Sequence, residues 1–280
     1  MHAFHQLLAA ACFLWPMAIP PACATASPPC EKEEKPDADK EEWPDIMSKA
    51  MARMGTGGGY ACTAKAFNNF INAFHDDEKK GIAIYPEKAR PSFCSSAVYT
   101  VLLLALDMWD SGHERPVIPR KAWLALHPKK QADGVGPWGY ANANGPGFAM
   151  LIHELKAGYS FTQWERAQPG DIMKLWWTEQ IGGRERGHLA IYRSQTDTGV
   201  TFWSSNQNNP NGKPGYGIKT VPKSQVRHVL FTRITNPKAF INAPTIGANK
   251  WLGTLLKTDI TPAEMHRRCG ISPITQKTHP

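Results

Sequence analysis

The chain has 280 residues, of which 42% are hydrophobic and 20% are charged, and it contains ten Trp. This composition excludes disordered, collagen-like and coiled-coil proteins, and the length suffices for one large domain whose core needs no metal or disulfide to hold it. With 32 Lys and Arg against 24 Asp and Glu, the formal net charge is +8, which favours anionic partners without identifying them.

The N-terminal residues have the pattern of a secretory signal peptide. Leu7 to Ile19 is apolar apart from Cys12 and Pro16, and Ala22-Cys23-Ala24 follows with the small-x-small pattern of a cleavage site. We therefore expect residues 1–26 to be a signal peptide and the protein to be secreted or periplasmic. Attachment of a lipid at Cys23 is a lesser alternative. No other stretch reaches the roughly 20 apolar residues that a membrane-spanning helix needs.

Charge is distributed unevenly along the rest of the chain. Residues 27–45 hold three positive and eight negative side chains, which predicts an acidic, solvated linker. Residues 46–280 carry 29 positive and 16 negative side chains, a net charge of +13. The basic residues are scattered, and neither zinc-finger spacing nor an RNP-like aromatic motif accompanies them, so no nucleic-acid partner is expected. An anionic cell wall or lipid surface fits this charge as well.

Helices are predicted in the first half of this basic region. Apolar residues at three- and four-residue spacing indicate a helix from about 61 to 74. After Pro91, residues 95–109 are apolar on nearly every side and Gly112 follows as a stop, so this helix belongs at the centre of a fold. A third helix is expected at 148–156, after a Gly-rich stretch from 133 to 147.

From Pro169 onward the pattern changes to short alternating runs that indicate strands of an antiparallel sheet. Helices first and strands later predict an α+β domain in which the central N-terminal helix packs on one face of the sheet. We assign this domain to residues 46–243, and residues 244–280 to a C-terminal extension with one short helix near 262–268. The predicted strands are 172–178, 188–193, 200–206, 218–221 and 229–234.

Cys94 lies in the first turn of the predicted central helix, where backbone N–H groups are unpaired. A helix terminus favours a thiolate by about 0.3–1 kcal/mol, less than the 1.36 kcal/mol that moves a pKa by one unit. A reactive thiol therefore needs a charged partner, which is usually an imidazolium. A structural role is the alternative, because Cys94 with Cys30, Cys62 and Cys269 would make two disulfides.

His188 is the candidate partner, since Gly187-His188 opens a predicted strand. A hairpin centred on Asp197 would place Asn206 opposite His188 on the next strand, near enough to orient the ring. A register slip of one residue would present Ser205 instead. Asn206 also begins a polar stretch rich in turn formers, so a plain turn residue is its alternative role.

Four short motifs resemble those of the NlpC-type and CHAP cysteine peptidases and amidases. They are Phe93-Cys94-Ser95-Ser96-Ala97-Val98, Gln168-Pro169-Gly170-Asp171 before a strand, Gly187-His188 opening another strand, and Ser205-Asn206-Gln207-Asn208. Their order and spacing are similar, and the resemblance covers roughly Pro91 to Ile234.

The resemblance implies a papain-like fold and hydrolysis of amide bonds in peptidoglycan peptides. Cys94 would be the nucleophile, His188 the general base and Asn206 the residue that orients the ring. CHAP domains often carry Gln just before the nucleophile, whereas this chain has Ser92-Phe93, so the Cys94 N–H is the one oxyanion donor that the sequence identifies. A noncatalytic envelope-binding module of the same fold, using the basic surface, is the alternative function.

Other residues receive smaller roles. Trp138 and Tyr140, in the Gly-rich stretch, are expected to line the substrate groove, with Trp176 or Trp177 as further candidates. Asp171 is expected to be a turn residue rather than a catalyst. No metal or other cofactor is expected, because the sequence has no His-Glu-x-x-His or Cys-x-x-Cys, and no Gly-x-Ser-x-Gly indicates a serine hydrolase.

Overall fold

The computed structural model describes residues 41–78 and 81–271. The expected signal peptide, most of the expected linker and Cys30 lie outside these residues. None of the helices in the described part has both the length and the apolar character needed to cross a membrane.

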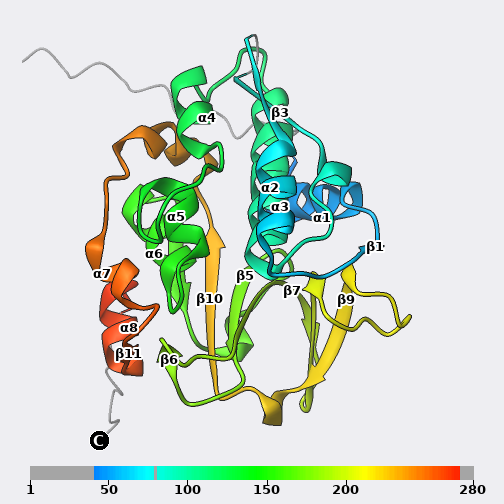
Figure 1. The fold of residues 1–280 in the computed structure, drawn as a ribbon, viewed down its shortest axis with the longest axis vertical. Helices are drawn as coiled ribbons and strands as arrows, with labels where there is room; N and C mark the ends of the chain where they lie inside the picture. Colours follow the sequence, from blue (N-terminus) through cyan, green and yellow to red (C-terminus); the bar gives the residue numbers. More distant parts are fainter. Residues whose placement is uncertain (1–40, 79–80, 272–280) are drawn as a thin grey trace, which may run out of the picture. The chain divides into compact units, whose positions relative to one another are not determined.

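A seven-stranded sheet in the order β1-β9-β8-β7-β5-β10-β4 forms one side of the molecule (Figure 1), and every neighbouring pair is antiparallel. This confirms the α+β class and the antiparallel sheet. The five predicted runs correspond to β5 and β7–β10, and β1 and β4 extend the edges. The strands are β1 (Gly57–Gly58), β4 (Gly158–Phe161), β5 (Ile172–Trp176), β7 (Gly187–Gln195), β8 (Gly199–Asn206), β9 (Gly215–Pro222) and β10 (His228–Ile234).

The predicted central helix is α3 (Cys94–Ser111), which packs on β7 and β8. Every side chain from Ala97 to Leu106 is buried, which explains why this helix is apolar on all sides. The Ser96 hydroxyl accepts a hydrogen bond from the Phe93 N–H (3.1 Å) and donates one to the Phe93 carbonyl (2.8 Å). This local cap ends the preceding extended segment at Phe93 and makes Cys94 the first helical residue.

Three of the remaining helices, α2, α6 and α8, lie close to the predicted positions, and the others were not predicted. Helix α1 begins at Trp43, inside the range predicted as linker, because its buried Ile46, Met47, Ala50 and Met51 form one apolar face. The helices are α1 (Trp43–Arg53), α2 (Ala64–Asn72), α4 (Arg120–Leu126), α5 (Gly136–Asn142), α6 (Gly147–Leu155), α7 (Lys250–Thr254) and α8 (Pro262–Arg268), with 3-10 helices at Pro86–Lys88, Trp164–Arg166, Lys223–Gln225 and Pro237–Thr245.

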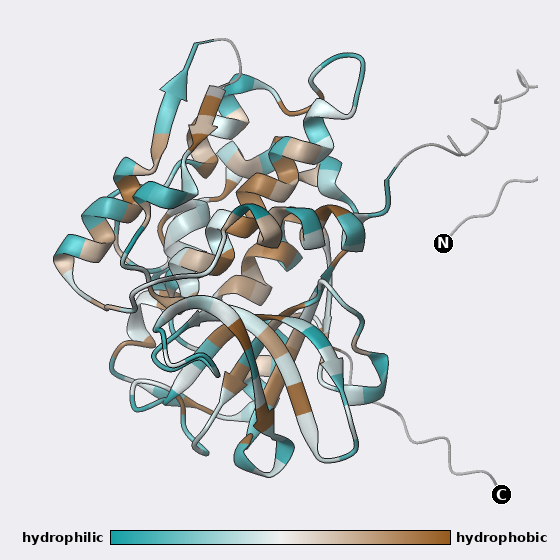
Figure 2. Ribbon diagram, turned by 90° about the vertical axis from the view of Figure 1, so that its right-hand side faces the viewer, coloured by the Kyte–Doolittle hydropathy of each residue, from teal (hydrophilic) through white to brown (hydrophobic). Residues whose placement is uncertain are grey.

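Each face of the sheet contributes to a different hydrophobic cluster. Along β7, Leu189 and Ile191 belong to the main core under the helices, whereas Ala190 and Tyr192 belong to a smaller cluster on the opposite face. In Figure 2 the hydrophobic stretches lie mainly on the helices in the middle of the molecule and along the strands, and the hydrophilic ones at loops and ends. Because side chains alternate along a strand, His188 lies on the face of the smaller cluster.

The segment assigned to a C-terminal extension belongs to the same hydrophobic core. Leu252, Leu255 and Met265 are buried within the main cluster, and β11 (Asp259–Ile260) pairs with β6 (Ile181–Gly182). The predicted short helix is α8. A separate two-stranded hairpin, β2 (Phe74–Asp77) with β3 (Gly81–Ile84), lies in the first half of the chain.

Candidate active site

The ends of β7 and β8 bring His188 and Asn206 together. Ile191 lies opposite Trp203, which is the register that the predicted hairpin requires, and a bulge at Arg193 shifts the pairing by one residue nearer the turn. His188 Nε2 and Asn206 Oδ1 are 3.1 Å apart, within hydrogen-bond distance. The predicted juxtaposition of His188 and Asn206 is confirmed. The bulge accounts for the one-residue shift in pairing between this end of the strands and the turn.

The surroundings of Asn206 fix which way its amide points. Its Nδ2 donates to Asn209 Oδ1 (2.9 Å), to the Gly217 carbonyl (3.0 Å) and, more weakly, to the Ser204 carbonyl (3.3 Å). The amide oxygen therefore faces His188 and accepts, so His188 Nε2 must carry the proton of that bond. In the neutral ring this leaves Nδ1 unprotonated and available as a base.

Asn209 holds Asn206 in this orientation. Its own Nδ2 donates to the carbonyls of Lys213 (2.7 Å) and Gly215 (3.0 Å), so its oxygen is the atom turned toward Asn206. A Cβ at Gly217 would lie 2.6 Å from Asn209 Oδ1, and only glycine leaves room for this contact. Asn209 is buried, although the stretch that contains it has the composition of a polar loop and gives no sign of this role.

His188 is partly buried, and its environment disfavours the charged ring. Burial lowers its pKa to about 4, the hydrogen bond to Asn206 opposes this shift, and the positive charges of Lys174 and Lys219 add to it. At neutral pH the ring is neutral. It is therefore in the form that accepts a proton.

A buried pair of serines anchors the start of α3 to the end of β8. The Ser92 hydroxyl donates to the Ser205 hydroxyl (2.8 Å), which in turn donates to the Ser92 carbonyl (3.2 Å). Cys94 follows Ser92 by two residues, and Asn206 directly follows Ser205. The Ser92 hydroxyl is thus engaged with Ser205 and helps to fix the start of α3 against the sheet.

Cys94 is a half-buried free thiol. Cys62 and Cys269 are also free in the described part of the chain. Cys94 is therefore in no disulfide there. Tyr60 lies beside it: burial raises the pKa of the Tyr60 phenol, and the nearby charges of Cys94 and Cys62 raise it further. Cys62 is exposed, and its thiol lies 3.4 Å from the Tyr60 hydroxyl.

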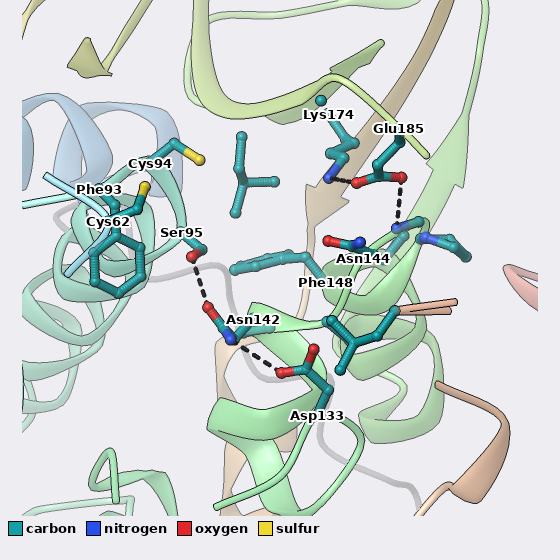
Figure 3. A pocket seen from close by; sticks show the side chains of 18 of the residues that line it. Cys62, Phe93, Cys94, Ser95, Asp133, Asn142, Asn144, Phe148, Lys174 and Glu185 are labelled. Atoms are coloured by element: carbon teal, nitrogen blue, oxygen red, sulfur yellow. Dashed lines mark hydrogen bonds and ion pairs between the residues drawn. The ribbon is translucent and has the colours of Figure 1, made fainter. Parts of the chain in front are cut away.

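Cys94 and His188 line two cavities that meet at the beginning of β7. Cys94 lines a cavity of about 460 Å³, shown in Figure 3, and His188 lines a second one of about 760 Å³ together with Asn206 and Tyr60. Glu185 and Gly187 line both cavities. Cys94 and His188 therefore line neighbouring cavities that share these two residues.

No hydrogen bond joins the Cys94 thiol to the His188 ring among residues 41–78 and 81–271. Catalytic hydrogen bonds are often long without substrate and tighten when it binds. Gly187 lies between the cavities, and a Cβ there would come within 2.9 Å of Lys174 Nζ and 3.0 Å of Glu185 Oε1. The glycine that precedes His188 therefore leaves room for the Lys174–Glu185 ion pair.

The predicted groove residues Trp138 and Tyr140 are not at the surface, and this prediction is wrong. They are 1% and 2% exposed, because the Gly-rich stretch forms helix α5 and turns its aromatic rings into the core. The Trp138 ring lies 4.5 Å from Phe70 and 5.2 Å from Tyr99, measured between ring centroids. The residues of this stretch that do line the Cys94 cavity are Asp133 and residues 141–146.

The other aromatic candidates and Asp171 have clear positions. Trp177 lines the His188 cavity, whereas Trp176 is fully buried and donates from Nε1 to Glu185 (2.7 Å). Asp171 makes a bidentate ion pair with Arg233, with both contacts at 2.8 Å, and accepts from the backbone N–H of Gln168 (2.7 Å). It is the turn and strand-start residue that the sequence predicts.

Within the described residues, no group of three or more His, Cys, Asp or Glu side chains is arranged to hold a metal ion. No family model matches the chain, and neither a curated protein nor a solved structure is significantly similar to it.

Proposed function

We propose that this chain is a cysteine amidohydrolase of papain-like, NlpC/CHAP type that cleaves amide bonds in peptidoglycan peptides. The observation that carries the proposal is the hydrogen bond from His188 Nε2 to Asn206 Oδ1, because Asn209 fixes the amide and so leaves Nδ1 as the base. The Ser92–Ser205 contact supports it further, since it joins the helix start that holds Cys94 to the strand end that holds Asn206.

The reaction follows from these roles. His188 Nδ1 takes the thiol proton as Cys94 Sγ attacks the amide carbonyl, and the same proton passes to the leaving amine when the C–N bond breaks. The acyl group is then held as a thioester. A water molecule gives a proton to His188 and attacks the thioester, which releases a carboxylic acid and returns the proton to Cys94.

Two donors are available for the oxyanion. The backbone N–H of Cys94 lies at the first helical position, where the helix provides no acceptor for it. The Tyr60 hydroxyl stays protonated because its pKa is raised, so it can donate beside the nucleophile. These donors replace the Gln that CHAP domains often carry.

The proposed compartment and partners agree with this chemistry. A secreted or periplasmic protein reaches peptidoglycan directly, and the net charge of +13 over residues 46–280 favours an anionic envelope surface. The mechanism uses groups of the protein and a water molecule, and it calls on no cofactor and no nucleic acid.

Digestion of purified peptidoglycan by the protein and by its Cys94→Ala variant tests the proposal. We expect the wild type to release new amino groups, and the folded variant to release none, because the nucleophile is gone. Cys269→Ala is the matched control for loss of a thiol outside the site. Hydrolysis by neither protein, with salt-sensitive binding to the wall by both, would favour the noncatalytic envelope-binding module instead.

A further inference from the structure

A second thiol, that of Cys62, is brought to the nucleophile by the backbone. The extended segments that lead into α2 and α3 pair in parallel, with Tyr60 opposite Ser92. Two backbone hydrogen bonds of 3.0 and 3.1 Å, both formed by Ser92, hold this pairing. Cys62 follows Tyr60 by two residues, and Cys94 follows Ser92 by two residues. The register of the pair therefore places both cysteines at the same end of it.

The spacing of this pair suits a disulfide. Neighbouring strands lie about 4.7–4.9 Å apart, and the Cα atoms of a disulfide are usually about 4.4–6.8 Å apart. Cys62 and Cys94 line the same cavity of about 460 Å³, and Figure 3 shows both sulfur atoms at one end of it, away from Lys174 and Glu185. Cys62 is exposed and Cys94 is half-buried, so a small oxidant in the cavity reaches both thiols.

The Tyr60 hydroxyl lies near both sulfur atoms. It is 3.4 Å from Cys62 Sγ. Burial raises the Tyr60 pKa, and negative charge on Cys94 or Cys62 raises it further. A phenol that stays protonated can donate a hydrogen bond to a thiolate, which stabilises the charged form of the sulfur. The same hydroxyl is therefore available to whichever of the two sulfurs carries the charge.

The third cysteine of the described chain is unsuited to this chemistry. Cys269 is 2% exposed, and burial raises its pKa to about 12. Its thiol therefore stays protonated at neutral pH, and a protonated thiol is a poor nucleophile. Among residues 41–78 and 81–271, Cys62 is the thiol placed to react with an oxidised Cys94.

We propose that Cys62 is a resolving thiol for Cys94, and that hydrogen peroxide converts the pair into a disulfide. The Cys94 thiolate attacks one peroxide oxygen and the O–O bond breaks, so the sulfur is oxidised to a sulfenic acid and the peroxide is reduced to hydroxide. The Cys62 thiolate then attacks the Cys94 sulfur, the S–S bond forms, and the S–O bond breaks to release a second hydroxide. The two hydroxides take up the two thiol protons and become water.

The disulfide protects the nucleophile and switches it off. A sulfenic acid that is not resolved is oxidised further to sulfinic and sulfonic acids, which thiol reductants do not reverse. A disulfide returns to two thiols by exchange with a reducing thiol. The modification goes beyond the proposed function, and only its consequence, a reversible loss of hydrolysis, rests on that function.

Peptide mapping after mild oxidation tests the proposal. The reduced protein, freed of reductant, is treated with hydrogen peroxide, alkylated, and digested with trypsin without reduction. We expect the peptides of residues 54–65 and 89–120 to be joined by a disulfide, because they contain Cys62 and Cys94. Cys62→Ser should abolish this product. Cys269→Ala, which removes a thiol outside the pair, should keep it.

Recovery of the Cys94 thiol gives a second, independent measurement. After excess peroxide and then dithiothreitol, iodoacetamide labelling of Cys94 should return almost completely in the wild type and stay mostly lost in Cys62→Ser, whose Cys94 is over-oxidised. Equal recovery in the two proteins would overturn the proposal, and so would a disulfide from Cys94 to Cys30 or to a second chain. Failure of the proposed function has a different signature, because the disulfide would still form while the reduced protein leaves peptidoglycan intact.

Discussion

The two halves of the candidate site are held in different ways. On the sheet side, His188 belongs to a chain of hydrogen bonds that runs through Asn206 and Asn209 to the carbonyls of Lys213 and Gly215. On the helix side, Cys94 opens a helix whose position is set by apolar burial. Its polar tie to the sheet is the contact between Ser92 and Ser205.

From this difference we infer that the sheet side determines which nitrogen of His188 carries the proton, while the helix side determines where Cys94 lies. A chain of oriented amides selects one tautomer of an imidazole, which apolar packing cannot do. The close packing of the buried residues from Ala97 to Leu106 fixes the position of the helix and therefore of Cys94 at its start. Substitutions in the sheet half should therefore alter rate and pH dependence, and the following predictions test this in order of expected size.

Replacing the base should have the largest effect. We expect His188→Gln to lower kcat/KM by about 10²- to 10⁴-fold, the usual contribution of a general base, while the protein stays folded. The measurement is hydrolysis of the cell-wall peptide, with circular dichroism as the folding check. A variant that retains most of its activity would show that His188 takes no proton.

Two substitutions of Asn206 should separate orientation from charge. Asn206→Leu removes the acceptor for His188 Nε2, so we expect a loss of about 10- to 100-fold in kcat/KM. Asn206→Asp keeps an acceptor and adds a negative charge that raises the His188 pKa. Its acidic limb in the pH–rate profile should therefore move to higher pH. Identical profiles for the wild type and Asn206→Asp would contradict this assignment.

Asn209→Ala should have a smaller effect, because it acts through Asn206. Loss of one hydrogen bond of about 1 kcal/mol predicts roughly a fivefold fall in kcat/KM, together with a changed pH–rate profile as the Asn206 amide becomes free to turn. Asn211→Ala, an exposed residue of the same loop, is the control. A fall in stability with an unchanged pH profile would reduce Asn209 to a purely structural residue.

The smallest predicted effect is on stability against acid. His188 has a pKa of about 4 in the folded protein and near 6.5 when unfolded, so the unfolded chain binds more protons between these values. Its contribution therefore lowers the free energy of unfolding as the pH falls from 6.5 toward 4. Urea titrations at pH 7 and pH 4.5 should show a smaller loss in His188→Gln than in the wild type, and an equal loss would contradict the lowered pKa.

Hydrophobic periodicity predicted the parts of this fold that depend on burial. The central helix, the five inner strands and the α+β class follow from residues 95–109 and the alternating runs after Pro169, because buried positions must be apolar at the period of their element. The pairing of His188 with Asn206 followed from counting across one hairpin. Helix α1 was not predicted, because the acidic composition of residues 27–45 indicated a linker and the helix begins within that range.

Features that depend on long-range contacts could not be predicted in the same way. Asn209 looks like any turn residue until its amide is seen to hold Asn206, and Asp133 lies in a stretch whose glycines suggested a loop. Trp138 and Tyr140 were expected at the surface because α5 was not predicted, and an aromatic side chain in a helix facing the core is buried. The pattern of residues in a single sequence does not show which polar groups form hydrogen bonds with one another in the fold.

The pairing of the Cys94 thiol with the His188 ring is tested most directly by the rate of alkylation of Cys94 as a function of pH. Iodoacetamide labelling, followed by mass spectrometry of the Cys94 peptide so that Cys62 is measured separately, gives this rate in the wild type and in His188→Gln. We expect Cys94 of the wild type to react faster at neutral pH than Cys94 of His188→Gln, because the neutral His188 ring can take up the thiol proton. Identical rate–pH profiles in the two proteins would contradict the pairing.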